Sequence, residues 1–232
     1  EVDWNEKHTL LKVGFPVDVH NDTWRNEIQF GHLVRNRHMN TSWDSARFEV
    51  CAHKWVDLSE ADYGVALLND CKYGHDTLED MVSLTLLKSA TGPDPGADEG
   101  THTFTYALLP HAGGFCAETV VREAYALNAP LTAHPLTTAN GTARALEFCA
   151  VDNPNVVVEA VKKAENDDAV VVRVYEANGG RATASLAFAR TVRKATECNL
   201  LEDEQQSVKV SEDGFTFSLR PFEIKTFKVH LR

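Results

Sequence analysis

Alternation of apolar and polar residues with a period of two is the feature that most constrains how this chain folds. It is clearest at residues 11–19, where the odd positions are all apolar: Leu11, Val13, Phe15, Val17 and Val19. Because successive side chains of a strand point to opposite faces of a sheet, this pattern predicts a half-buried β-strand. Pro16 has no backbone N–H to donate, so we expect this strand at a sheet edge or at a bulge.

The same alternation returns many times along the chain and predicts further strands. The runs are Ile28, Phe30 and Val34; Phe48, Val50, Ala52 and Trp55; Val82, Leu84 and Leu86; Phe104, Tyr106 and Leu108; Val156 and Val158; Val170, Val172 and Val174; Phe215, Phe217 and Leu219; and Phe227, Val229 and Leu231. Turn sequences such as PDPGADEG, NGG and SEDG separate them, and only residues 117–127 have a helical rhythm. Many short strands between turns predict an all-β fold of antiparallel sheets packed face to face, a β-sandwich with few helices.

A change in composition predicts two domains. Residues 128–143 read NAPLTAHPLTTANGTA, which is rich in Pro, Thr and Ala and is typical of a linker or a long crossover. We therefore expect a larger β-sandwich portion over residues 1–132 and a smaller terminal β domain over residues 133–232. No unit repeats at a fixed length, so the pattern does not favour a propeller or a solenoid.

The charge and the overall composition exclude several function classes. The chain has 23 Lys and Arg against 34 Asp and Glu, a net charge of −11, so we expect no nucleic-acid partner, because phosphate backbones bind basic surfaces. Of its 232 residues 43% are hydrophobic and 25% are charged, which is typical of an ordinary folded protein and not of a membrane-spanning chain. We expect no membrane partner.

The cysteines favour a cytoplasmic location. The five cysteines are widely spaced, with no Cys-x-x-Cys pair, and are better explained as free thiols in a reducing compartment: Cys51, Cys71, Cys116, Cys149 and Cys198. The first ten residues, EVDWNEKHTL, show neither the basic nor the apolar region of a signal peptide. Three Asn-x-Ser/Thr glycosylation triplets, at Asn21, Asn40 and Asn140, would instead favour a secreted protein, but we interpret them as chance occurrences.

No self-contained catalytic motif is present in the sequence. There is no glycine-rich loop leading into a helix, no Gly-x-Ser-x-Gly elbow and no His-Glu-x-x-His, and the ten histidines have no metal-site spacing. The paired carboxylates of a glycosidase are brought together by the fold and leave no spacing signal. The sequence therefore gives no self-contained active site.

The segment HMNTSWDSAR, residues 38–47, combines groups that bind sugars. An indole ring such as that of Trp43 can lie against the C–H face of a sugar while Asp44 and Arg47 bind hydroxyl groups. The alternative is a structured loop in which Asp44 caps or turns the chain and Arg47 pairs with it. The sequence does not decide between the two.

The segment NDCKYGHD, residues 69–76, joins two apolar runs. A tight hairpin turn explains Asn69, Asp70 and Gly74, because these residue types favour turns. It explains Lys72 and Tyr73 less directly, and loops on a rigid β scaffold are where binding groups are often presented.

Five long strings in this chain resemble the C-terminal part of glycoside hydrolase family 38, the α-mannosidases, and most closely its cytosolic/vacuolar and bacterial branch. They are DWNEKHTLLKVGFPVDV, QFGHLVRNRHMNTSWDSARFEVCAHKWVDLSE, YGVALLNDCKYGHD, PDPGADEGTHTFTYALLPH and FSLRPFEIKTFKV. They run in the family's order over nearly the whole chain. The resemblance implies that this chain is the trailing part of a longer enzyme.

The resemblance also implies where the chemistry lies. In the family an N-terminal α/β barrel and a helical bundle come first, and the barrel carries a divalent ion, usually zinc, and the aspartate nucleophile of a retaining mechanism. The resemblance therefore implies that no catalytic residue and no metal ligand lies within these 232 residues. These N-terminal barrel and helical domains would be the intramolecular partners of the sandwich, and a mannose-containing oligosaccharide would be the substrate. A sandwich without its barrel would expose an apolar interface, through which it would form a homo-oligomer.

By the same resemblance, four residues are candidates for the wall of the active site: Asp70, Lys72, Tyr73 and Lys88. The family favours Arg where Lys88 stands and often has Tyr in place of His75. Two alternatives stay open: an autonomous carbohydrate-binding module that uses Trp43, Asp44, Arg47 and Tyr73, and a scaffold that only supports the barrel.

Overall fold

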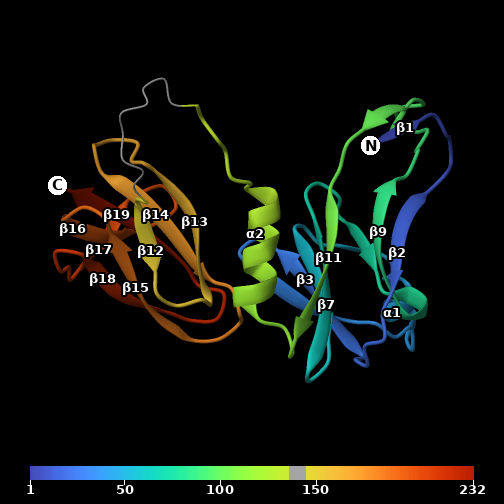
Figure 1. Cartoon of the computed structure of the whole chain (residues 1–232), viewed down its shortest axis with the longest axis horizontal. Coiled ribbons are helices and arrows are strands. Elements are labelled where there is room, and N and C mark those ends of the chain that lie inside the picture. Colours follow the sequence, from blue (N-terminus) through green and yellow to red (C-terminus); the bar gives the residue numbers. More distant parts are fainter. Residues whose placement is uncertain (136–144) are drawn as a thin grey trace. The chain divides into compact units, whose positions relative to one another are not determined.

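The computed structural model describes residues 1–135 and 145–232, which form two compact units, residues 1–131 and 132–232 (Figure 1). The Asn140 triplet and part of the expected linker lie outside the described residues. Each unit is built from antiparallel sheets, so the predicted all-β fold is confirmed.

The first unit contains a five-stranded, a four-stranded and a two-stranded sheet. In spatial order the five-stranded sheet is β11 (Tyr106–Ala112), β7 (Tyr63–Asn69), β6 (Trp55–Ser59), β3 (Thr23–Ile28) and β4 (Gly31–Asn36). The four-stranded sheet is β2 (Leu11–Pro16), β9 (Met81–Leu87), β8 (Gly74–Asp76) and β5 (Val50–Cys51). The small sheet pairs β1 (Val2–Trp4) with β10 (Gly100–His102). The helical elements are α1 (Ser42–Ser45), the 3₁₀ turn η1 (Leu78–Asp80), the π-helical turn η2 (Ala117–Val121) and α2 (Arg122–Asn128).

The two larger sheets of this unit share one apolar core, as expected for a sandwich. Val56 and Leu67 of the five-stranded sheet and Val82 and Leu84 of the four-stranded sheet are fully buried in it. Strands β6 and β7 are buried along almost their whole length on both faces, because η2 and α2 cover their outer face. The helical rhythm predicted at residues 117–127 is confirmed and explains why β7 reads as a continuous apolar run instead of an alternating one.

The described part of the second unit is a smaller sandwich of eight strands. One sheet is β12 (Cys149–Val151), β15 (Ala182–Phe188) and β18 (Gly214–Leu219); the other is β13 (Val156–Lys163), β14 (Val170–Glu176), β19 (Ile224–Leu231), β16 (Val192–Cys198) and β17 (Glu204–Val208). In the first sheet, Leu219, Phe217 and Phe215 lie opposite Ala182, Ala184 and Leu186, and all six are buried. The predicted alternation therefore places one parity of each strand in a shared core.

Some strand predictions are confirmed and others are wrong. Strand β2 lies at the edge of its sheet, as Pro16 predicts. The run Ile28, Phe30 and Val34 is not one strand: Phe30 has φ 59° in a tight turn, and β3 and β4 pair on either side of it. The run from Phe48 to Trp55 is also broken, because β5 and β6 belong to different sheets.

Candidate functional site

The loop of residues 69–76 connects two different sheets. Asn69 ends β7 in the five-stranded sheet and Gly74 begins β8 in the four-stranded sheet. The hairpin interpretation of NDCKYGHD is therefore wrong, because β7 and β8 do not pair. Residues 70–73 form a crossing between the two layers of the sandwich, and we call residues 69–76 the crossing loop.

Asn69 fixes the path of the crossing loop. Its side chain is 1% exposed and donates from Nδ2 to the carbonyl of His53 at 2.8 Å. Its Oδ1 accepts the backbone N–H groups of Cys71 at 3.1 Å and Lys72 at 2.6 Å. A buried asparagine with both ends bonded holds backbone from two segments in one geometry.

His75, within the crossing loop, stabilises the loop as a buried and uncharged ring. The side chain is fully buried, and burial lowers the pKa of His75 from 6.5 to about 4. Its Nδ1 lies 3.1 Å from the carbonyl of Tyr73 and its Nε2 lies 3.4 Å from Asn69 Nδ2. Nδ1 must then carry the hydrogen and donate to Tyr73, while Nε2 accepts from Asn69. His75 and Asn69 together hold the backbone of Tyr73.

A surface cavity of about 200 Å³ lies beside the crossing loop. It is lined by Ile28, Gln29, His53, Lys54, Asn69, Asp70, Tyr73 and Asn128. The Tyr73 ring is 52% exposed and its centroid lies 5.1 Å from that of His53, at an angle of 57°. His53 Nε2 lies 3.0 Å from the side-chain amide of Gln29. An open aromatic ring beside amide, imidazole and carboxylate groups is suited to a polyhydroxylated ligand.

Helix α2 and a partly buried ion pair support the cavity. Asn128 donates from Nδ2 to the carbonyl of Asn69 at 2.9 Å, so the end of α2 is bonded to the loop. Lys54 Nζ lies 2.7 Å from Glu27 Oε1 and 4.7 Å from the centre of the Tyr125 ring. Burial raises the pKa of Glu27, although the neighbouring Lys54 opposes this shift.

The structure places two of the four wall candidates, Asp70 and Tyr73, in this cavity. Burial alone would raise the pKa of Asp70, but hydrogen bonds from Cys71 and the Thr105 backbone outweigh it and lower the pKa. Asp70 is therefore an anionic acceptor at neutral pH. Lys72 points elsewhere, with Nζ 5.1 Å from the centre of the Phe104 ring.

Lys88, the fourth candidate, does not line the cavity. It follows β9 directly, its side chain is exposed, and its backbone N–H donates to Asp98 Oδ2 at 3.0 Å.

The segment of residues 38–47 forms the single helical turn α1. Thr41 is the N-cap: its hydroxyl accepts the Asp44 N–H at 3.1 Å and donates to Asp44 Oδ2 at 2.6 Å. Trp43 is 75% exposed. Asp44 and Arg47 line a separate cavity of about 350 Å³, so they do not share the crossing-loop cavity with Tyr73.

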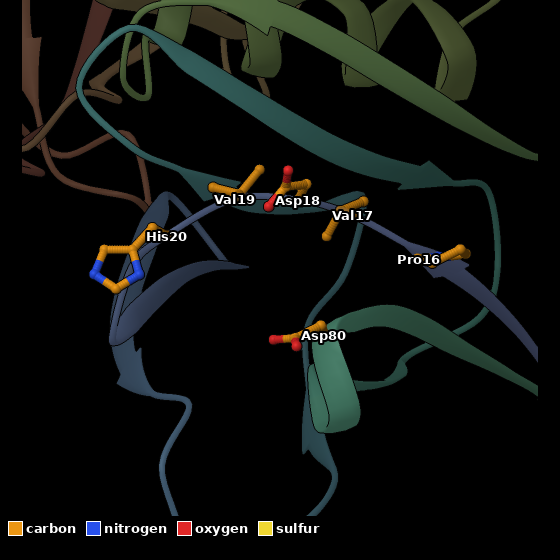
Figure 2. A pocket seen from close by; sticks show the side chains of 6 residues that line it. All are labelled: Pro16, Val17, Asp18, Val19, His20 and Asp80. Carbon is orange, nitrogen blue, oxygen red and sulfur yellow. The ribbon is translucent and has the colours of Figure 1, made fainter.

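A wider hollow lies between the end of β2 and η1. Figure 2 shows its lining, with Pro16 at one end, the His20 ring at the other and Asp80 on η1 across the hollow from the intervening segment. Its volume is about 510 Å³. The Asp80 side chain is 91% exposed and lies 3.5 Å from Arg37 Nη2. Among the described residues no Trp, Tyr or Phe side chain lines this hollow, so we prefer the crossing-loop cavity as the candidate site.

The described residues do not fit a metal centre. Within residues 1–135 and 145–232, no three His, Cys, Asp or Glu side chains come together in a way that could hold a metal ion. All five cysteines are free thiols. Among the same residues, no helix is both long and apolar enough to cross a membrane.

Sequence reasoning missed several residues that line the candidate site, among them the polar residues Gln29, His53 and Asn128. They come from the β3–β4 turn, the residues before β6 and the end of α2. No local pattern marks them, because only the fold brings these three segments together.

Fold and site together define a two-domain β-sandwich protein with a polar cavity edged by aromatic rings. Residues 1–96 match the model of the glycosyl hydrolases family 38 C-terminal domain, and residues 155–227 match that of the family 38 C-terminal beta sandwich domain. The chain belongs to glycoside hydrolase family 38, as a C-terminal region of that family.

Its relatives are much longer proteins. The chain is 44% identical to Alpha-mannosidase G of Dictyostelium discoideum, over 98% of this chain and 21% of that protein. It is 45% identical to Alpha-mannosidase 2C1 of Homo sapiens, over 97% of this chain and 22% of that protein. It is 36% identical to Alpha-mannosidase of Saccharomyces cerevisiae, over 98% of this chain and 23% of that protein. The chain therefore spans between a fifth and a quarter of the length of these relatives.

A solved structure shows the same fold. The crystal structure of an alpha-mannosidase from Enterococcus faecalis superposes with a TM-score of 0.77 at 21% identity, over 95% of this chain and 26% of that chain.

Proposed function

We propose that this chain is the C-terminal β-sandwich part of a longer α-mannosidase, which removes terminal α-mannose from oligosaccharides. The support is that relatives 36–45% identical over nearly the whole chain are named α-mannosidases and are more than four times as long. N-terminal barrel and helical domains of the same polypeptide would be the partners of the sandwich.

In this proposal the bond-breaking groups lie outside these 232 residues. The family resemblance assigns a divalent metal, zinc by expectation, and the nucleophile of a retaining reaction to the barrel. The described residues offer no cluster that fits a metal, so no step of the chemistry is assigned to them. Their role would be to complete and shape the site.

The observation that carries this role is the crossing loop, which is fixed by Asn69 and His75 and presents Tyr73 and Asp70 at one cavity. The ring of Tyr73 would lie against the apolar C–H face of a mannose unit, and Asp70 would accept hydrogen bonds from its hydroxyl groups. Lys72 and Lys88 would add positive charge near the loop without lining the cavity.

The proposed location is the cytoplasm, supported by five free thiols and an acidic net charge of −11. The Asn21 side chain does not favour glycosylation, because it is already bonded to the Ser59 carbonyl at 2.6 Å and to Thr23 N–H at 3.0 Å. Self-association of the separated sandwich through its exposed apolar side chains is part of the same proposal.

Hydrolysis of an aryl α-mannoside tests the enzyme assignment. The full-length protein should cleave the substrate, and a clean preparation of the 232-residue chain should neither cleave it nor bind stoichiometric zinc. Cleavage by the isolated chain would show that the catalytic groups have been placed wrongly.

An autonomous carbohydrate-binding module is the second candidate, favoured by the exposed ring of Trp43 on α1. Titration of the 232-residue chain with mannose oligosaccharides separates the two. A binding module should retain saturable affinity without the rest of the protein and lose it on Trp43→Ala, whereas a part of an active-site wall should bind weakly and be insensitive to Trp43.

A further inference from the structure

A second cavity, of about 350 Å³, is lined by residues of two edge strands of the first unit. Strand β4 is the outermost strand of the five-stranded sheet and β5 is the outermost strand of the four-stranded sheet. Leu33 and Val34 of β4 and Val50 of β5 form its apolar wall. Its charged groups are Arg35, Asp44 and Arg47.

Arg35 is held in place but keeps free donors. Its Nη2 donates to the Cys51 carbonyl at a long 3.5 Å, which ties the side chain to the opposite sheet. Its Nε is buried and has no hydrogen-bond partner among the described residues. That Nε is too enclosed for a ligand to reach, but Nη1 makes no hydrogen bond among the described residues and is open to an acceptor in the cavity.

Arg47 enters the same cavity from the segment after α1. Only its backbone is bonded, to the Asp44 carbonyl at 2.9 Å. Its side chain is exposed and, within the part of the chain that the structure describes, makes no hydrogen bond or salt bridge. Two guanidinium groups from separate elements therefore line one cavity with most of their donors unused.

Asp44 does not neutralise this pair. Its carboxylate is occupied by the Thr41 hydroxyl at 2.6 Å and the Asn36 amide at 3.1 Å, and His38 Nδ1 lies 3.6 Å away. Hydrogen bonds from Thr41 and Asn36 lower the pKa of Asp44, and the charge of Arg47 makes a smaller contribution in the same direction. Asp44 therefore carries one negative charge against the two positive charges of the arginines. The cavity retains an excess of positive charge on a chain whose net charge is −11.

We propose that this cavity binds a phosphate group, carried by a sugar or free in solution, between Arg35 and Arg47. Planar guanidinium groups bind the oxygens of phosphate in pairs, which suits two guanidinium groups with unused donors that line one cavity. Trp43 does not line the cavity, but its exposed ring lies on α1 four residues before Arg47 and would contact a sugar attached to that phosphate. This site is separate from the crossing-loop cavity and does not depend on the proposed function.

Equilibrium dialysis of the full-length protein against inorganic phosphate and mannose 6-phosphate tests the proposal. The informative variant is Arg47→Gln, which removes an exposed charge without touching the core. Arg190→Gln is the matched control, because Arg190 is an exposed arginine of the second unit. Phosphate that binds elsewhere in the longer protein does so equally in the wild type, Arg47→Gln and Arg190→Gln, so it does not contribute to the differences between them.

We expect Arg47→Gln to weaken phosphate binding about tenfold, which is about 1.4 kcal/mol, and Arg190→Gln to leave it unchanged. Trp43→Ala distinguishes the two sources of the phosphate group. If Trp43→Ala weakens the binding of mannose 6-phosphate but not of inorganic phosphate, the ligand is a sugar phosphate. If it weakens the binding of neither, the ligand is the free phosphate ion. Equal affinities of the wild type and Arg47→Gln for both ligands, with unchanged unfolding curves, would overturn the proposal.

Discussion

Replacing His75 should remove a defined part of the acid sensitivity of the first unit. In the folded chain the ring is buried and neutral, with a pKa of about 4, whereas the ordinary pKa of histidine is 6.5. Between these values the unfolded chain binds a proton that the folded chain does not, so the free energy of unfolding falls as the pH falls. A pKa difference of about 2.5, at 1.36 kcal/mol for each pKa unit, gives about 3 kcal/mol lost between pH 6.5 and pH 4.

Urea unfolding followed by tryptophan fluorescence measures this loss. All four tryptophans, Trp4, Trp24, Trp43 and Trp55, lie in residues 1–131, so the signal reports on the first unit alone. Carboxylates that titrate in the same range are shared by wild type and His75→Gln, so the difference between the two proteins isolates His75. The control is His20→Gln, which replaces an exposed histidine of the same unit.

The wild type should lose about 3 kcal/mol more than His75→Gln between pH 6.5 and pH 4, and His20→Gln should follow the wild type. If the free energy of unfolding falls by the same amount for wild type and His75→Gln between pH 6.5 and pH 4, His75 is not a buried neutral ring. The hydrogen bond that we assign from its Nδ1 to the Tyr73 carbonyl would then be wrong.

Three further predictions concern stability and are read from unfolding curves. Asn69→Ala removes three hydrogen bonds shorter than 3.2 Å and should lower the free energy of unfolding of the first unit by about 3 kcal/mol. The control Asn5→Ala, at an exposed position, should change this free energy by less than about 0.5 kcal/mol. Equal effects of the two substitutions would contradict the role of Asn69. Trp43→Ala should also stay within about 0.5 kcal/mol, because the ring is 75% exposed, and a larger loss would show that it packs in the fold. Phe227→Ala, at a fully buried position in the core of the second unit, should lower the free energy of unfolding of that unit by about 3–5 kcal/mol, measured by calorimetry. The unfolding transition followed by tryptophan fluorescence, which reports on the first unit, should not shift. A shift of that transition would show that the two units unfold together.

Local alternation predicted the fold where a strand has one buried face. In β18, Phe215, Phe217 and Leu219 alternate because their other neighbours face solvent, and the structure buries all three. The pattern failed at Phe30, where alternation continues through a turn that a positive φ makes possible. It also failed at residues 69–76, because a run of turn residues does not say which sheet the next strand joins.

The candidate site was predicted only in part, for a related reason. The crossing loop stands out in the sequence, so Asp70 and Tyr73 were found. Gln29, His53 and Asn128 were not predicted from the sequence. Each is an ordinary polar residue in or next to a different element and lies near the crossing loop only in the tertiary structure.

The central claim is that the crossing loop forms part of the active-site wall of a longer α-mannosidase, and kcat/KM for an aryl α-mannoside tests it most directly. The comparison is full-length Tyr73→Ala against Tyr63→Ala, a tyrosine 40% exposed at the start of β7 and outside the cavity. Tyr73→Ala should lower kcat/KM about tenfold or more, about 1.4 kcal/mol of transition-state stabilisation, with unfolding unchanged and Tyr63→Ala near wild type. A kcat/KM for Tyr73→Ala equal to that of the wild type would contradict the claim and leave the sandwich as a scaffold.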